Sequence, residues 1–448
     1  MKHPLLAFLA AVLSFLTVDA HDITGTWSGI LKINPQNSMR LVFHIAQDSI
    51  TMDSPDQNAY GIKGQLRYLS DDSLSMGVTG LRMNFTGKLI NDSLVGTFRQ
   101  GPFTLPLTLA AGVKRAKRPQ TPQPPFPYTT EDVTITAPEA VLSGTLVVPE
   151  HATKPTPVVV LVSGSGQQNR DEELFEHKPF AVIADYLARR GIASLRYDDR
   201  GYGKSKGQLD NATTSDFAED ARAVVNYLHQ SGRFDRIGMI GHSEGGMIAC
   251  MLGAEPGVLD FIVSIAGPAV SGAEINAYQN KIALINSGID SLHAEQFETA
   301  LLKALRYRLT NTPLSTVSDE QLLDIYPQRD DSPVTRNLGN TITATLTMTT
   351  IQPWMEYFLR FDPAHVMSNV KIPAMIIYGE KDCQVPPSLN IEPAKKYIPK
   401  ANVRSYPELN HLMQHAKTGN VDEYKNIEET FSEEVLSDIT TFIPSSKE

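Results

Sequence analysis

One serine in this sequence stands in a setting that could make it a nucleophile. Ser243 is the centre of segment 241–246, Gly-His-Ser-Glu-Gly-Gly, which matches the pattern G-x-S-x-G. A short apolar run (237–240) precedes the segment, and a stretch with helical spacing (247–252) follows it. A serine on a tight strand-to-helix turn takes strained backbone angles, and neighbouring chains pass so close that both glycines must stay small. The pattern predicts an exposed nucleophile, whereas the alternative is a glycine-rich turn whose serine only caps a helix.

A serine hydroxyl is a weak nucleophile at neutral pH and needs a histidine base that a carboxylate orients. After such a turn, the acid and then the histidine are expected further along the chain. Asp382 follows an apolar run that ends at Tyr378, and His411 follows the last predicted strand. Both would lie in loops at the carboxyl end of a strand. We therefore predict a catalytic triad of Ser243, Asp382 and His411.

The elements that must position these residues alternate between strand and helix from about residue 128. An opening hairpin is predicted at 133–135 and 143–148, followed by apolar strands at 157–162, 192–197, 237–240, 261–266, 374–378 and 401–406. Amphipathic helices are predicted at 180–189, 217–229 and 433–443. This alternation predicts an α/β fold with a mostly parallel, doubly wound sheet.

One insertion, residues 268–370, interrupts the alternation. Its pattern predicts helices at 273–287, 291–309, 319–326 and 341–357. Because it follows the strand after the nucleophile, it would lie over the carboxyl end of the sheet. We expect a helical cap that shapes the pocket and excludes water.

The part of the chain before residue 112 has a different pattern. Short strands separated by Asn, Asp and Gly are predicted at 24–31, 39–45, 64–69, 73–78, 83–89, 93–98 and 103–109. They indicate an antiparallel β domain over 21–111, closed or nearly closed as a small barrel or sandwich, with an accessory role. Residues 112–127 combine a basic run with prolines and are expected to be an exposed linker to the domain at 128–448.

Together these segments resemble the α/β-hydrolase family, in its esterase and serine-aminopeptidase-like branch. The matching motifs are G-H-S-E-G-G at 241–246, G-E-K-D-x-x-V-P at 379–386, L-N-H at 409–411 and D-D-R-G-Y-G-K-S at 198–205. The resemblance covers about 128–446 and leaves out the amino-terminal domain. It implies an α/β-hydrolase fold with a helical cap insertion, preceded here by the small antiparallel β domain.

The motifs also bear on competing residues. The family's G-x-x-D spacing favours Asp382 over Glu380 as the acid. His242 lies beside the serine and cannot turn to face it, and His415 lies beyond the expected loop position, so His411 is favoured as the base.

An oxyanion hole needs two backbone N–H groups. One is expected from Glu244, directly after the nucleophile. The resemblance places the other in the loop 163–168, where family members often carry His-Gly-x, and the residue after that glycine is Ser165, with Gly166 as the alternative. Asp199 and Arg200 are expected to form an ion pair beneath the site, and residues 169–172 to line the pocket mouth.

The expected function is that of a serine hydrolase that cleaves carboxylic esters through an acyl-enzyme, with no cofactor or metal implied. A peptidase with the same triad, an aminopeptidase or dipeptidase, is the alternative. It would need an anchor for a free amino terminus, for which Glu274 and Asp290 are candidates. A non-catalytic binding protein on a hydrolase scaffold is a third reading. The substrate would be a small ester or a short peptide.

Composition limits the remaining possibilities. The 448 residues predict two or three domains, and the formal net charge of −10 argues against a nucleic-acid partner. Two cysteines, Cys250 and Cys383, are too few for a disulfide-stabilised scaffold, and no cysteine spacing indicates a metal site. A disulfide between the two is the less favoured alternative to free thiols.

Residues 1–20 carry a basic start, an apolar run and a small-residue end at Ala20. This pattern predicts a cleaved signal peptide, so the protein would be exported to the periplasm or secreted. No later segment is long and apolar enough to predict a membrane span.

Overall fold

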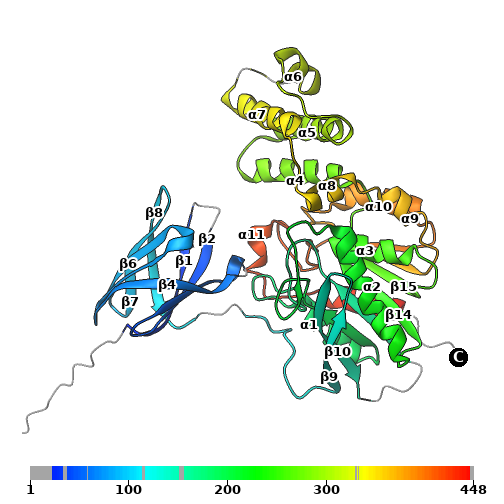
Figure 1. The fold of residues 1–448 in the computed structure, drawn as a ribbon, viewed down its shortest axis with the longest axis horizontal. Helices are drawn as coiled ribbons and strands as arrows, with labels where there is room; N and C mark the ends of the chain where they lie inside the picture. Colours follow the sequence, from blue (N-terminus) through cyan, green and yellow to red (C-terminus); the bar gives the residue numbers. More distant parts are fainter. Residues whose placement is uncertain are drawn as a thin grey trace, which may run out of the picture. The chain divides into compact units, whose positions relative to one another are not determined.

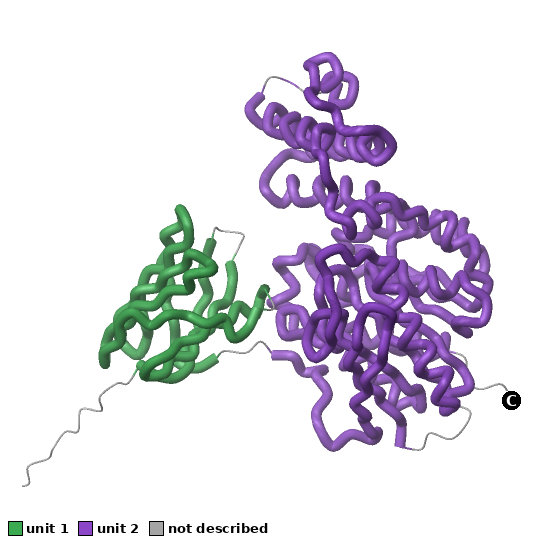
Figure 2. Tube along the Cα trace, in the orientation of Figure 1, with its two compact units in different colours: residues 1–115 green, residues 116–448 purple. Residues whose placement is uncertain are grey.

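The computed structural model describes residues 23–33, 38–57, 59–113, 117–150, 156–327, 330 and 332–443 (Figure 1). The chain divides into two compact units, residues 1–115 and 116–448 (Figure 2). The predicted signal peptide lies outside the described residues. None of the described helices has both the length and the apolar composition that crossing a lipid bilayer requires.

The first unit is a closed antiparallel barrel. Its strands are β1 (Gly25–Lys32), β2 (Ser38–Ile45), β3 (Ile50–Ser54), β4 (Ala59–Leu69), β5 (Ser73–Val78), β6 (Met83–Ile90), β7 (Ser93–Gln100) and β8 (Phe103–Ala111). Each strand pairs with the next, and β8 returns to β1. Phe43 and Phe85 stack inside the barrel with ring centroids 5.5 Å apart. The predicted antiparallel domain is confirmed. The short strand β3, whose apolar residues are only Ile50 and Met52, was not predicted.

The second unit is built on one sheet with the strand order β13-β10-β12-β11-β14-β15-β16-β17, and β9 pairs with β10. The strands are β9 (Tyr128–Thr136), β10 (Ala140–Pro149), β11 (Pro157–Val162), β12 (Ala193–Tyr197), β13 (Lys206–Gly207), β14 (Arg236–His242), β15 (Phe261–Ile265), β16 (Ala374–Gly379) and β17 (Asn402–Tyr406). Those from β12 to β17 in this order are parallel. Every residue of β11 and β16 is buried, which explains their continuous apolar sequences.

Helices cover both faces of this sheet. They are α1 (Pro179–Ala188), α2 (Thr214–Ser231), α3 (Glu244–Gly253), α10 (Pro387–Tyr397), α11 (Val421–Tyr424) and α12 (Glu433–Phe442). Neighbouring residues of one strand point to opposite faces. Val159 and Ile240 thus join one core with α1 and α12, whereas Val158 and Met239 join the other with α2, α3 and α10. The predicted α/β-hydrolase fold is therefore confirmed.

The cap is a bundle of helices between β15 and β16 (Figure 1). It consists of α4 (Gly272–Asn286), α5 (Ser291–Thr310), α6 (Asp319–Ile325), α7 (Pro333–Thr347) and α8 (Pro353–Arg360), followed by the short α9 (Pro363–Met367). Phe297, Leu301 and Ile342 belong to its own hydrophobic core. The single helix predicted at 341–357 is wrong. Pro353 starts a new helix because it lacks an N–H group and disfavours helical angles in the residue before it.

Residues 112–127 were expected to form an exposed linker, but the middle part of this stretch is bound to the second unit. Arg118 donates hydrogen bonds to the backbone carbonyls of Phe175, Lys425 and Ile427. Gln120 donates to the carbonyl of Phe431 and accepts from two backbone N–H groups, those of Thr430 and Phe431. Residues 112, 113, 117, 119 and 123–127 are exposed, whereas residues 118 and 120–122 are partly buried. Residues 118–120 are therefore anchored to the second unit.

Candidate active site

Ser243 lies on the turn between β14 and α3 in a strained conformation, with φ 53° and ψ −114°. Its backbone N–H donates to the carbonyl of Ile265 at 2.8 Å. A Cβ at Gly241 would overlap the carbonyl of Gly245, and one at Gly245 would overlap the carbonyl of Val162. The steric reason predicted for both glycines is confirmed.

His411 and Asp382 are in direct contact. His411 Nδ1 lies 2.7 Å from Asp382 Oδ2, and both residues are buried. Asp382 Oδ1 accepts hydrogen bonds from the backbone N–H groups of Gln384 and Val385 at 2.7 and 2.8 Å. These donors hold the carboxylate in place. A carboxylate at Nδ1 leaves Nε2 as the ring nitrogen that can act as a base.

Ser243 and His411 line the same cavity, although the hydrogen bonds of the described residues include none between their side chains. The competing residues lie elsewhere. Glu380 accepts from Ser405 Oγ at 2.9 Å, and His415 Nδ1 lies 2.8 Å from Glu429 on the surface. Of the residues weighed as acid and base, the structure thus brings together Asp382 and His411.

The expected oxyanion loop approaches the serine closely. A Cβ at Gly164 would lie 3.2 Å from Ser243 Cβ, and Gly164, Ser165 and Glu244 all line the cavity. Glu244 is the first residue of α3, and N–H groups in a first helical turn lack an intrahelical acceptor. Such groups can bind negative charge that develops near the serine.

The expected Asp199–Arg200 ion pair is wrong. Arg200 instead pairs with Asp220 of α2, Nε to Oδ2 at 2.7 Å, with both side chains buried. Asp199 accepts from Ser163 Oγ at 3.0 Å and from the N–H of Gln168 at 2.9 Å. Burial raises the pKa of Asp199 to about 8 despite these hydrogen bonds. Asp199 therefore supports the two ends of the oxyanion loop, 163–168.

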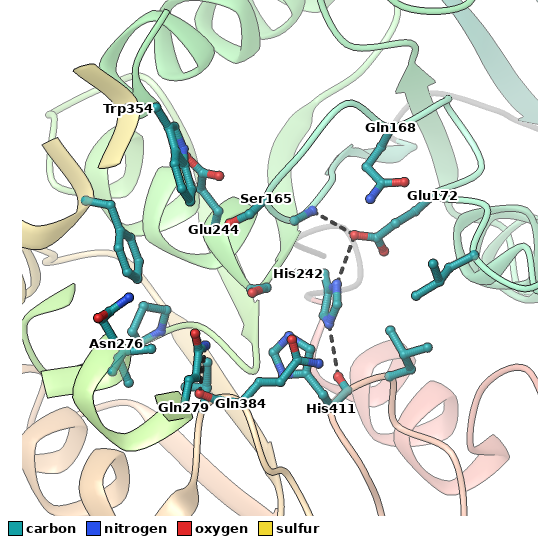
Figure 3. A pocket seen from close by; sticks show the side chains of 18 of the residues that line it. Ser165, Gln168, Glu172, His242, Glu244, Asn276, Gln279, Trp354, Gln384 and His411 are labelled. Carbon is teal, nitrogen blue, oxygen red and sulfur yellow. Dashed lines mark hydrogen bonds and ion pairs between the residues drawn. The ribbon is translucent and has the colours of Figure 1, made fainter. Parts of the chain in front are cut away.

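Residues 169–172, expected at the pocket mouth, separate into two roles. Arg170 turns away and pairs with Asp198 at 2.8 Å. Glu172 lines the cavity but is buried, and its Oε1 lies 2.9 Å from His242 Nδ1 (Figure 3). Neither Glu172 nor His242 was predicted as a functional residue. The sequence offers two signals for this pair: an acid just after the oxyanion loop and a histidine beside the nucleophile.

The cavity has a volume of about 240 Å³ and walls of two kinds. The cap contributes an apolar wall in which the rings of Trp354 and Phe358 stack 5.6 Å apart. Amide side chains lie near His411, where Figure 3 shows Gln279 beside Gln384. The lining residues include no Lys or Arg. These walls suit an uncharged ligand better than an anionic one.

A buried carboxylate connects the cap to the nucleophile turn. Glu244 Oε1 accepts hydrogen bonds from Trp354 Nε1 of α8 at 2.8 Å and from Thr214 Oγ1 of α2 at 2.6 Å. Burial raises the pKa of Glu244, and these donors act in the opposite direction. Only the backbone N–H of Glu244 was assigned a role from the sequence.

The candidate anchors for a peptide amino terminus have structural roles instead. Glu274 accepts from the N–H and hydroxyl of Ser271 at the start of α4, and Asp290 caps α5 through the N–H of His293. Neither lines the cavity.

Cys250 is buried and Cys383 partly exposed, and both are free thiols. Among the described residues, no group of three or more His, Cys, Asp and Glu side chains is arranged to hold a metal ion.

Fold and sequence together define the class of protein. The family described as alpha/beta hydrolase fold matches residues 157–418, which is more than half of the chain. The chain therefore belongs to the α/β-hydrolase family, and the resemblance inferred from its motifs is confirmed.

Two curated relatives carry names that state esterase activity, and so does one of the solved structures that are similar to the chain. Esterase EstD of Thermotoga maritima is 27% identical over 310 residues, and the alignment covers 66% of each chain, just under two thirds. The bifunctional esterase/perhydrolase DCH of Acinetobacter calcoaceticus is 22% identical over 242 residues, which are 51% of this chain and 78% of DCH. A solved esterase of Pyrococcus furiosus has a TM-score of 0.43 at 17% identity, covering 74% of this chain and 98% of that one.

Proposed function

We propose that this protein is a serine hydrolase that cleaves small, uncharged carboxylic esters. The observation that carries the proposal is the buried Asp382–His411 pair, whose His411 lines the same cavity as Ser243 on its strained turn. The similarity to proteins named as esterases supports the choice of ester. The peptidase alternative is weaker, since Glu274 and Asp290 do not line the cavity.

The reaction follows from these positions. Ser243 Oγ attacks the ester carbonyl while His411 Nε2 takes its proton, and Asp382 stabilises the imidazolium. The N–H groups of Glu244 and Ser165 stabilise the oxyanion. The alcohol leaves with the proton from His411, and water then hydrolyses the acyl-enzyme through the same base.

The test is a panel of p-nitrophenyl acyl esters beside aminoacyl p-nitroanilides, measured on the wild type and on Ser243→Ala. We expect ester hydrolysis by the wild type and a fall in kcat of roughly 10⁶ in the variant, because the triad acts as a unit. A fluorophosphonate should label the wild type at Ser243. Labelling that persists in Ser243→Ala would place the nucleophile elsewhere, and faster cleavage of the anilides would favour the peptidase.

We also propose that the protein is exported, on the pattern of residues 1–20. Mass spectrometry of the protein recovered from its source should find residue 21 as the first residue. An intact amino terminus would contradict this proposal.

A further inference from the structure

A chain of hydrogen bonds behind Ser243 joins three segments that are far apart in the sequence. Glu172 Oε1 accepts from the N–H of Gly164 at 2.7 Å and lies 2.9 Å from His242 Nδ1. On the other side of the ring, His242 Nε2 donates to the backbone carbonyl of His411 at 3.0 Å (Figure 3). The chain thus connects the oxyanion loop, the nucleophile turn and the loop of the catalytic base.

Both nitrogens of His242 face acceptors, so the ring needs a proton on each while Glu172 is ionised. Glu172 is 5% exposed and His242 is 7% exposed, so the pair is shielded from water. Burial opposes a charge on the ring, but the Glu172 carboxylate and its hydrogen bond outweigh burial and raise the pKa of His242. The carbonyl of His411 and the more distant Asp382 act in the same direction.

The position of this pair matters because the chain holds the parts whose spacing sets the reaction geometry. Gly164 belongs to the loop that approaches Ser243 closely, and His411 carries the base. A misplacement of about 1 Å between reacting groups can cost 10²-fold in rate. One carboxylate and one imidazole hold the oxyanion loop and the base loop together through the residue next to the nucleophile.

We propose that Glu172 and His242 are a positioning pair for catalysis, which acts through Gly164 and His411 rather than on the reacting atoms. This inference rests on the proposed esterase function. It adds two residues to the site that its triad and oxyanion hole do not include.

The decisive variant is Glu172→Gln. The amide oxygen of the new glutamine can still accept a hydrogen bond from the N–H of Gly164. The uncharged amide cannot neutralise a protonated His242 ring, so the ring becomes neutral. A neutral ring carries one proton and can donate from Nδ1 or from Nε2, but not from both. One of the two connections is then lost. We expect kcat for p-nitrophenyl acetate to fall about 10- to 100-fold, with KM changed less than about threefold and cooperative unfolding retained.

Two further variants isolate the pair. Glu173→Gln is the matched control, because Glu173 belongs to the same loop but contacts Asn169 and Lys178, and it should stay within about twofold of wild type. His242→Gln should lower kcat by a similar factor. The double variant Glu172→Gln/His242→Gln should have a kcat no lower than that of the less active single variant, because the two residues act as one unit.

The pH profile separates positioning from a merely structural role. The contribution of the pair is present below the raised pKa of His242 and is lost as pH rises through it. Glu172→Gln lowers that pKa, so the alkaline limb of kcat/KM should move to lower pH.

If Glu172→Gln does not fold, nitrogen-15 NMR of the histidines in the wild-type protein tests the protonation of His242 directly. Two protonated nitrogens on His242 at neutral pH support the pair, and a neutral ring overturns it.

The outcomes distinguish this inference from the proposed function. Wild-type protein with neither ester hydrolysis nor fluorophosphonate labelling would overturn the function, and the inference with it. Activity that depends on Ser243, combined with a Glu172→Gln variant within threefold of wild-type kcat and an unmoved alkaline limb, would overturn the positioning pair alone.

Discussion

Three carboxylates surround the oxyanion loop, with Glu172 and Glu244 buried and Asp199 partly buried, and each has a different set of partners. Glu172 faces an imidazole, Glu244 accepts from an indole and a hydroxyl, and Asp199 accepts from a hydroxyl and a backbone N–H. Asp199 is the one whose pKa is raised to about 8. Burial raises the pKa of Glu244 as well, so the folded protein favours the neutral carboxyl at both Asp199 and Glu244 more than water does.

Replacing Asp199 by Asn should make stability less sensitive to alkaline pH. The ordinary pKa of 3.8 is raised to about 8 in the folded state, so the folded protein favours the neutral carboxyl. Stability is then full below about pH 4 and declines as pH rises towards 8. Asparagine stays neutral, and its amide can still accept from Gln168 and donate to Ser163. Between pH 5 and pH 9, the unfolding temperature of wild type should fall by several degrees more than that of Asp199→Asn. An equal fall in unfolding temperature for the two proteins would contradict a raised pKa of Asp199.

Replacing Asp382 by Asn should separate the two acid candidates. The change removes the acceptor at His411 Nδ1 and favours the wrong tautomer, which costs about 10⁴ in kcat in the best-studied serine-protease triad. Glu380→Gln is the matched control, because the Glu380 side chain accepts a hydrogen bond from Ser405 of β17, and this variant should lose less than about threefold in kcat. The measurement is kcat of both variants on one ester. A larger loss in Glu380→Gln than in Asp382→Asn would identify Glu380 as the acid.

At the scale of elements, the cap and the sheet meet at Glu244. Its side chain joins α3, which begins at the nucleophile, to α2 through Thr214 and to α8 through Trp354. The helices α4 and α8 both contribute cavity-lining residues, Gln279 and Trp354 among them. The width of the cavity thus depends on how α8 is held against the nucleophile turn.

Replacing Trp354 by Phe should loosen this connection without emptying the aromatic wall. The variant removes the donor to Glu244 and leaves a buried carboxylate with fewer partners, which costs about 1–3 kcal/mol. We expect kcat/KM to fall about tenfold, mainly through KM, with fluorophosphonate labelling of Ser243 retained. Phe358→Leu alters the same wall but keeps the hydrogen bond and serves as the control. Equal losses in the two variants would mean that wall shape, not the bond, is responsible.

At the scale of the whole molecule, the two units have separate cores, and the boundary between them lies near residue 116. All of the proposed catalytic residues belong to the second unit. Arg118 and Gln120 also belong to it, through their hydrogen bonds to backbone groups between residues 175 and 431. The second unit therefore begins before its first strand.

Truncation before residue 117 should accordingly leave a folded hydrolase unit, and truncation before Tyr128 should weaken it. The shorter chain lacks Arg118 and Gln120, and hydrogen bonds of a charged donor contribute about 1.5–3 kcal/mol each at most. We expect the chain starting at 117 to keep its kcat/KM on a small acetyl ester within about threefold of the full chain. The chain starting at 128 should unfold at a lower temperature. Equal unfolding temperatures would mean that residues 118–120 contribute nothing to the unit.

The features that depend on local sterics and on chain order can be predicted from the amino-acid sequence. Gly241 and Gly245 are required by contacts within the turn and with the adjacent strand, and alternating buried strands and helices predict the sheet. The order of Ser243, Asp382 and His411 along the chain follows from the same topology. Pro353 is a local signal as well, because a proline starts α8 although helical spacing continues on either side of it.

Which charged groups pair with each other depends on the folded chain. Arg200 pairs with Asp220 rather than with its neighbour Asp199, because successive side chains after β12 point to different surroundings. The Glu172–His242–His411 chain joins residues 70 and 169 positions apart in the sequence. Such partners depend on how loops from separate strands pack together. Neither periodicity nor spacing records that packing, so the contacts that hold the site together could be found only in the folded chain.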